Sequence, residues 1–123
     1  MGPGLFNVLK EVLYLRTIRF IVEDQYMKVT PSNLIDDLVP GTEEYLRCEF
    51  HFSSKWNGYI KVASFTSRLG YLYESRVLDD GLYCIVPSES LKKRIFKVQI
   101  TGKKGESFLT TNKCTVIQGG KNI

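Results

Sequence analysis

The sequence predicts an all-β domain with two facing antiparallel sheets, because it combines a high aromatic content with period-two alternation. The 123 residues include seven tyrosines, seven phenylalanines and one tryptophan. Aromatic and β-branched side chains pack well on a pleated sheet. From about residue 17 onward, apolar residues recur at every second position, which is the period of a strand with one buried face. The length suits one core, so we expect one domain over residues 17–118 and a flexible tail over 119–123.

The clearest strand runs from Tyr45 to Phe52. One of its faces is apolar and the other is polar; these faces consist of Leu46, Cys48, Phe50 and Phe52, and of Arg47, Glu49 and His51. One buried face and one solvated face are typical of an antiparallel sheet, whereas strands of a buried parallel sheet are apolar on both faces.

Eight further strands are expected from the same alternation. They cover residues 17–22, 26–29, 59–66, 71–78, 82–86, 95–101, 107–111 and 113–117. Short strands that recur every ~8–12 residues, with turn residues between them, indicate a sandwich or a barrel. The strand pattern therefore predicts an antiparallel sandwich or barrel.

The connections carry recognisable turn signals. In Asp79-Asp80-Gly81 the glycine can adopt a positive φ angle, which predicts a hairpin turn. Residues 30–44 contain two prolines, a glycine and paired acids, so we expect a surface connection in which Leu34, Ile35, Leu38 and Val39 cover apolar surface. Residues 88–94 are compatible with one helical turn, with Ser88 as the N-cap and Leu91 packed inward.

The N-terminal extension, residues 1–16, has a different pattern. Apolar side chains recur at helical spacing, at Leu5, Val8, Leu9, Val12 and Leu13. They predict a short amphipathic docking helix, which needs this domain or a partner to bury its apolar stripe. An alternative is that translation begins at Leu15 through an alternative start codon, because Lys10-Glu11-Val12 can be encoded by a purine-rich ribosome-binding sequence. On that hypothesis residues 1–14 are never made.

Charge and hydropathy argue against nucleic-acid and membrane partners. The net charge is +4, but basic residues cluster only at Lys92-Lys93-Arg94 and Lys103-Lys104, both in turn contexts typical of solvated loops. No apolar run approaches the ~20 residues of a membrane span, and no signal peptide pattern opens the chain. We expect a protein made in the cytoplasm.

No catalytic or cofactor constellation stands out. The three cysteines, Cys48, Cys84 and Cys114, lie within apolar runs and lack the close spacing of metal ligands, so we expect buried free thiols. The single histidine, His51, lies on a polar strand face next to Glu49 and has no adjacent nucleophile. The acid pairs lie in loops without the ligand spacing of a calcium site; they are Asp36-Asp37, Glu43-Glu44 and Asp79-Asp80. We expect no enzyme activity, no metal and no cofactor.

The tyrosines are the one chemically suggestive feature. Tyr59, Tyr71, Tyr73 and Tyr83 are candidates for a sugar-stacking platform or a protein contact, since tyrosine is common in both kinds of interface. The alternative is that they fill the core or pack along the strands.

Five segments, in order, resemble a family of small immunoglobulin-like modules encoded in the tail and baseplate regions of phages and prophages of Gram-positive bacteria. They are Phe50 to Gly58 (FHFSSKWNG), Ala63 to Thr66, Val77 to Gly81 with Cys84 to Pro87, Phe96 to Gly102 (FKVQITG), and Leu109 to Lys113. The resemblance covers Ile18 to Val116; Asn57 stands where an Asp is usual, and the N-terminal extension has no counterpart.

This resemblance implies an immunoglobulin-like antiparallel β-sandwich. It also implies a non-enzymatic structural or accessory protein of a bacteriophage virion, made in the bacterial host cytoplasm and attached to the tail, the baseplate or the capsid surface. Other virion proteins are the expected partners, with multiple copies per particle. The expected contact surface combines the four tyrosines with Lys92, Lys93 and Arg94. The alternative function is a carbohydrate-binding module that contacts the bacterial cell wall, and a third is a host-directed regulator that binds a bacterial protein through an edge strand.

Overall fold

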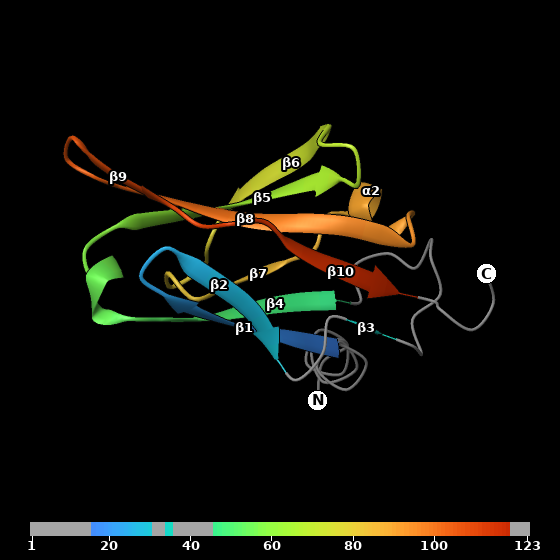
Figure 1. The fold of residues 1–123 in the computed structure, drawn as a ribbon, viewed down its shortest axis with the longest axis horizontal. Helices are drawn as coiled ribbons and strands as arrows, with labels where there is room; N and C mark the ends of the chain where they lie inside the picture. The colour runs from blue at the N-terminus through green and yellow to red at the C-terminus, as the bar shows by residue number, and fades with distance from the viewer. Residues whose placement is uncertain (1–15, 31–33, 36–45, 119–123) are drawn as a thin grey trace, which may run out of the picture.

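The computed structural model describes residues 16–30, 34–35 and 46–118. In these residues, two β-sheets pack face to face (Figure 1). The prediction of an all-β sandwich is confirmed. The immunoglobulin-like character stays a prediction. Three predictions lie outside the described residues: the tail over 119–123, the alternative start at Leu15, and the docking helix with Leu5, Val8, Leu9, Val12 and Leu13.

The first sheet has four strands in the spatial order β2-β1-β4-β7. Their bounds are Arg16–Glu23 (β1), Tyr26–Thr30 (β2), Leu46–Phe52 (β4) and Tyr83–Ile85 (β7). The predicted alternation along β4 is confirmed, since Leu46, Cys48 and Phe50 are buried and His51 is exposed.

The second sheet follows the order β3-β10-β8-β5-β6, and β9 pairs with β8 off this path. The bounds are Leu34–Ile35 (β3), Ile60–Ser67 (β5), Leu72–Val77 (β6), Ile95–Lys104 (β8), Ser107–Thr110 (β9) and Cys114–Gln118 (β10). The β8–β9 hairpin projects from one end of the sandwich, and the short helix α2, Ser88–Leu91, lies at the other end (Figure 1).

Antiparallel pairing predominates, but two strand pairs are parallel. β1 runs parallel to β4 from the pair Arg16–Leu46 to the pair Val22–Phe52, and β3 runs parallel to β10. A parallel neighbour requires a long connection, which the chain between β2 and β4 provides. The two-residue strand β3 lies in the segment for which the sequence predicts a loop. Two residues are too few to show the alternation that indicates a strand.

The helical turn near residue 88 forms, but with a different cap. The N-cap of α2 is Pro87, not Ser88, and no side chain caps the helix. Ser88 was the expected cap because its hydroxyl can accept from the first helical N–H groups, yet the helix begins one residue earlier and places Ser88 inside it. Leu91 is buried, as predicted.

Trp56 closes one end of the core between the two sheets. It ends a 3-10 turn, Ser54–Trp56, and is fully buried. Its indole Nε1–H donates to the main-chain oxygen of Asp24 in the β1–β2 turn at 2.6 Å. Its ring also contacts the rings of Phe52 and Tyr59, with centroids 5.3 and 6.0 Å away. This single side chain therefore joins both sheets and the link between β4 and β5.

Asn112 makes a second connection between the sheets. Its Oδ1 accepts from the main-chain N–H of Met27 at 2.7 Å, and its Nδ2 donates to the main-chain oxygen of Met27 at 2.9 Å. The side chain thus replaces a strand partner for buried Met27 on β2. Such pairing is required because an unpaired buried main-chain group costs about 1–3 kcal/mol.

We predict that Gly102→Ala destabilises the domain. A Cβ atom at this position of β8 would lie 2.7 Å from Cζ3 of Trp56 and 3.2 Å from Cδ2 of Tyr59. The two rings are packed in the core and cannot move away without strain. The free energy of unfolding should therefore fall by about 1–3 kcal/mol, measured by chemical denaturation.

The Trp56→Phe background provides the control, since the smaller ring leaves room for the new methyl group. The cost of Gly102→Ala should shrink there, and the coupling between the two substitutions is the quantity to measure. An equal cost in both backgrounds would contradict steric conflict with the indole.

Candidate functional site

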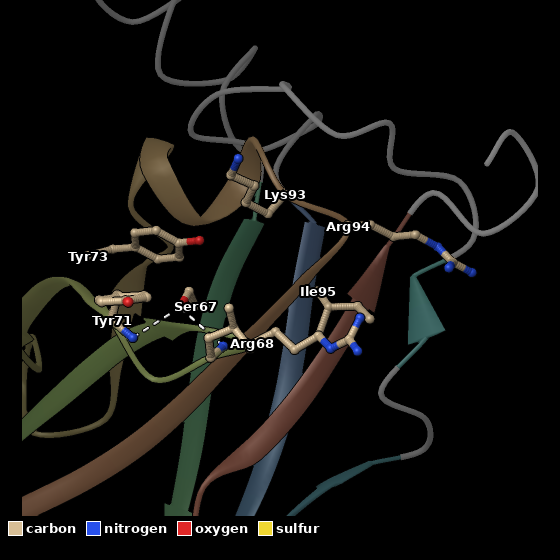
Figure 2. Close-up of a pocket in the computed structure, with 8 residues that line it drawn as sticks. Ser67, Arg68, Tyr71, Tyr73, Lys93, Arg94 and Ile95 are labelled. Atoms are coloured by element: carbon tan, nitrogen blue, oxygen red, sulfur yellow. Dashed lines mark hydrogen bonds between the residues drawn. The ribbon is translucent and has the colours of Figure 1, made fainter.

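An open pocket of about 610 Å³ lies at the α2 end of the sandwich, where the β5–β6 turn faces the loop between α2 and β8 (Figure 2). Its lining includes three basic side chains, two tyrosines and no acidic residue. The lining residues are Ser67, Arg68, Leu69, Tyr71, Tyr73, Lys93, Arg94 and Ile95.

Ser67 fixes the turn that forms one wall of the pocket. Its Oγ accepts hydrogen bonds from the main-chain N–H groups of Leu69 and Tyr71, at 3.2 and 3.0 Å (Figure 2). Its own N–H donates to the Tyr71 carbonyl at 2.8 Å, and Gly70 closes the turn with a φ of 99°. The turn is therefore held at both ends, and Arg68, Leu69 and Tyr71 are presented at fixed positions.

A register shift directs Tyr73 to the same wall. Phe65 pairs with Glu74, but the next residue of β5, Thr66, pairs with Leu72, so Tyr73 has no partner in the ladder. An extra residue of this kind is a β-bulge, which bends the strand and re-aims a side chain. Tyr73 packs partly against the core, and it lines the pocket together with Tyr71 (Figure 2).

The opposite wall is the loop after α2, which Gln118 holds in place. The buried Nε2 of Gln118 donates to the carbonyls of Leu91 and Lys93 at 2.8 and 2.7 Å. The Gln118 main-chain N–H also donates to the Arg94 carbonyl at 2.8 Å. Lys93 extends on the same side as the Tyr73 hydroxyl, whereas Arg94 extends away from the tyrosines (Figure 2). The end of β10 thus positions the two basic residues.

The pocket suits a ligand that has both a ring face and a negative charge. Tyrosine rings stack on flat apolar surfaces and offer a polar hydroxyl at the edge. Arg68 and Lys93 can donate charge-assisted hydrogen bonds to a carboxylate or a phosphate, and no carboxylate in the lining competes for them.

The structure brings together four of the seven residues expected to form a contact surface, namely Tyr71, Tyr73, Lys93 and Arg94. Four further residues line the pocket and were not part of the predicted contact surface: Ser67, Arg68, Leu69 and Ile95. The Arg68-Leu69-Gly70 turn signal, directly before Tyr71, would have identified the first three, since a glycine with positive φ commonly marks such a turn.

The other three expected residues lie elsewhere. Tyr59 packs edge-on against Trp56. The Tyr83 hydroxyl donates to Asp80 at 3.2 Å, and the negative charge of Asp80 raises the pKa of Tyr83. Lys92 forms an ion pair with Glu89 at 2.9 Å. These residues do not line the pocket.

His51 occupies an exposed charged cluster on the outer face of the first sheet. Its Nε2 lies 3.1 Å from a carboxylate oxygen of Glu49, and Arg19 Nε donates to the same oxygen at 3.0 Å. The hydrogen bond to His51, with a further contribution from Arg19, lowers the pKa of Glu49. Within the described residues, no three His, Cys, Asp or Glu side chains lie close enough together to hold a metal ion. Asp36-Asp37 and Glu43-Glu44 lie outside them.

No family model matches the chain, and no curated protein matches it significantly. None of the described helices is long and apolar enough to cross a membrane.

We predict that Ser67→Ala loosens the pocket wall without disturbing the core. The N–H groups of Leu69 and Tyr71 lose their acceptor. Their amide hydrogens should exchange faster, and stability should fall by about 0.5–1.5 kcal/mol. Hydrogen exchange measured by NMR is the readout.

Ser75→Ala is the matched control, because it removes a side-chain hydrogen bond from the same hairpin, to Ser64, but touches no turn amide. If the two variants change the exchange of Leu69 and Tyr71 equally, Ser67 does not fix the turn.

Proposed function

We propose that the protein is a non-enzymatic, immunoglobulin-like structural or accessory protein of a bacteriophage virion, attached to the tail, the baseplate or the capsid surface. Five sequence segments between Phe50 and Lys113 resemble, in the same order, those of small virion modules. The all-β sandwich is compatible with that resemblance. Its partners are other virion proteins, with multiple copies per particle. The protein is made in the cytoplasm of the bacterial host and resides in the particle.

The tip of the β5–β6 hairpin carries this proposal, because it exposes large apolar side chains. Leu69, Tyr71 and Leu72 are 82%, 73% and 62% exposed. Adjacent apolar side chains in water are unfavourable for an isolated domain and are characteristic of protein contact surfaces. β6 also ends the strand order of its sheet among the described strands. A virion neighbour that covers this tip would bury all three side chains.

Mass spectrometry of gradient-purified particles from the phage that carries the gene tests this proposal. The protein should be present in repeated copies, and Leu69→Ser with Leu72→Ser should reduce its incorporation by about tenfold or more, the equivalent of about 1.4 kcal/mol of lost binding.

Phe108→Ser is the control, since Phe108 is an exposed apolar residue on a different hairpin. It should leave incorporation unchanged. A protein that is abundant in infected cells but absent from particles would instead support a host-directed regulator.

The second candidate is a carbohydrate-binding module that contacts the bacterial cell wall. The specific observation in its favour is the pocket, in which Tyr71 and Tyr73 lie beside Lys93 and Arg68. A sugar ring can pack against the tyrosines while an acidic substituent of the same sugar accepts hydrogen bonds from the basic side chains. Acidic saccharides are thus the expected ligands.

Oligogalacturonate and its methyl ester form a matched pair of probes, because esterification removes the charge and keeps the sugar rings. We expect binding of the acidic form and a loss of about tenfold or more with Tyr71→Ala or Tyr73→Ala, measured by isothermal titration calorimetry. Tyr26→Ala, an exposed tyrosine outside the pocket, is the control. Binding that is indifferent to the two pocket substitutions would rule out this site.

A further inference from the structure

Two of the three cysteines face each other across neighbouring strands. Cys48 on β4 is directly opposite Cys84 on β7 in the antiparallel ladder. Their side chains are 0% and 2% exposed, and both are free thiols. Burial raises the pKa of the Cys48 thiol well above its usual value, and the neighbouring Cys84 raises it further.

The hydrogen bonds of the ladder define how far apart the two residues lie. The main-chain N–H of Phe50 donates to the carbonyl oxygen of Leu82 at 2.7 Å, and the main-chain N–H of Val86 donates to the carbonyl oxygen of Leu46 at 2.8 Å. Antiparallel hydrogen-bonded pairs recur at every second residue, which makes Cys48 and Cys84 the intervening hydrogen-bonded pair. The Cα atoms of such a pair are about 5.5 Å apart. Disulfide-bonded cysteines have Cα separations of about 4.4–6.8 Å.

β7 is the strand that can make the small adjustment a sulfur–sulfur bond requires. It has only three residues and ends the strand order of its sheet among the described strands. In a hydrogen-bonded pair the opposite Cβ atoms lie near the upper end of about 4.5–5.5 Å, whereas a disulfide requires about 3.5–4.5 Å, so β7 must move toward β4 by about 1 Å or more. A short edge strand opens locally more readily than a central strand such as β4, so Cys84 becomes accessible first.

We propose that Cys48 and Cys84 are a cross-strand disulfide site, which is oxidised when the protein meets a small-molecule disulfide such as oxidised glutathione. Cys84, as its thiolate, attacks one sulfur of the oxidised glutathione and displaces one glutathione thiolate. Cys48 then attacks Cys84 Sγ in the mixed disulfide and displaces the second glutathione. The two released thiolates take up the two protons that the cysteines lose. One disulfide is reduced and one is formed.

This bond would tie β7 to β4 and close a loop that includes β5 and β6, together with the pocket wall between them. A protein that folds in a reducing medium would keep both thiols, and in an oxidising medium its β7 would become cross-linked to β4. This inference does not depend on the proposed function, because it concerns the thiols of the isolated domain.

Cys114 serves as the internal control. It lies on β10 of the other sheet, and its Sγ–H donates to the main-chain oxygen of Met27 at 3.1 Å. Burial raises the pKa of Cys114 to about 11. It has no opposing cysteine, because its register partner on β8 is Val98.

The test is to incubate the full chain with oxidised glutathione, quench with acid, denature, alkylate the free thiols and count them by mass spectrometry. The count should fall from three to one, and peptide mapping should find Cys48 linked to Cys84. Dithiothreitol should restore all three thiols. Three free thiols after incubation in a denaturant-free buffer, a stable glutathione adduct on Cys84, or a bond to Cys114 would overturn the proposal.

Variants separate the two steps. Cys114→Ala should form the cross-link as the native chain does. Cys48→Ala should stop at the glutathione adduct on Cys84, since the second attack is lost. If Cys48→Ala does not fold, hydrogen exchange of the native chain replaces it: the amides of β7 should exchange at least about tenfold more slowly after oxidation. Unchanged exchange would count against a bond between β7 and β4.

Discussion

The packing of Trp56 between the two sheets is the constraint on which the rest of the fold depends. Its indole needs a hydrogen-bond acceptor, which the Asp24 carbonyl provides, and it needs space, which Gly102 provides by having no side chain. Removing so large a buried side chain typically costs about 3–5 kcal/mol, a large part of the stability of a small domain. The β1–β2 turn, the β4–β5 link and β8 are thereby fixed relative to one another.

The opposite end of the sandwich is organised by polar groups rather than by a large ring. Ser67 holds the β5–β6 turn, and the buried amide of Gln118 holds the loop that carries Lys93. Between them, the bulge at Tyr73 brings a second aromatic ring to the pocket. The end around Trp56 stabilises the domain, and the end around Ser67 and Gln118 exposes the side chains that line the pocket.

The strands could be predicted from the sequence because burial alternates along them, as it does along β4 and β8. The parallel pairing of β1 with β4 could not, since alternation defines the buried face of a strand but not its neighbour. For the same reason, Tyr71 and Tyr73 could not be separated from Tyr59 and Tyr83. A register shift and a turn, which leave little trace in an alternating pattern, determine which tyrosines line the pocket.

The bulge has a consequence for how this surface can change over time. Tyr73 is surplus to the β5–β6 ladder, so the sheet closes its hydrogen bonds without it. Replacing its ring alters the lining of the pocket while the strand pairs on both sides remain intact. Evolution, or a protein engineer, can therefore vary this side chain without changing the strand register, and the cost is limited to the part of the ring that packs against the core.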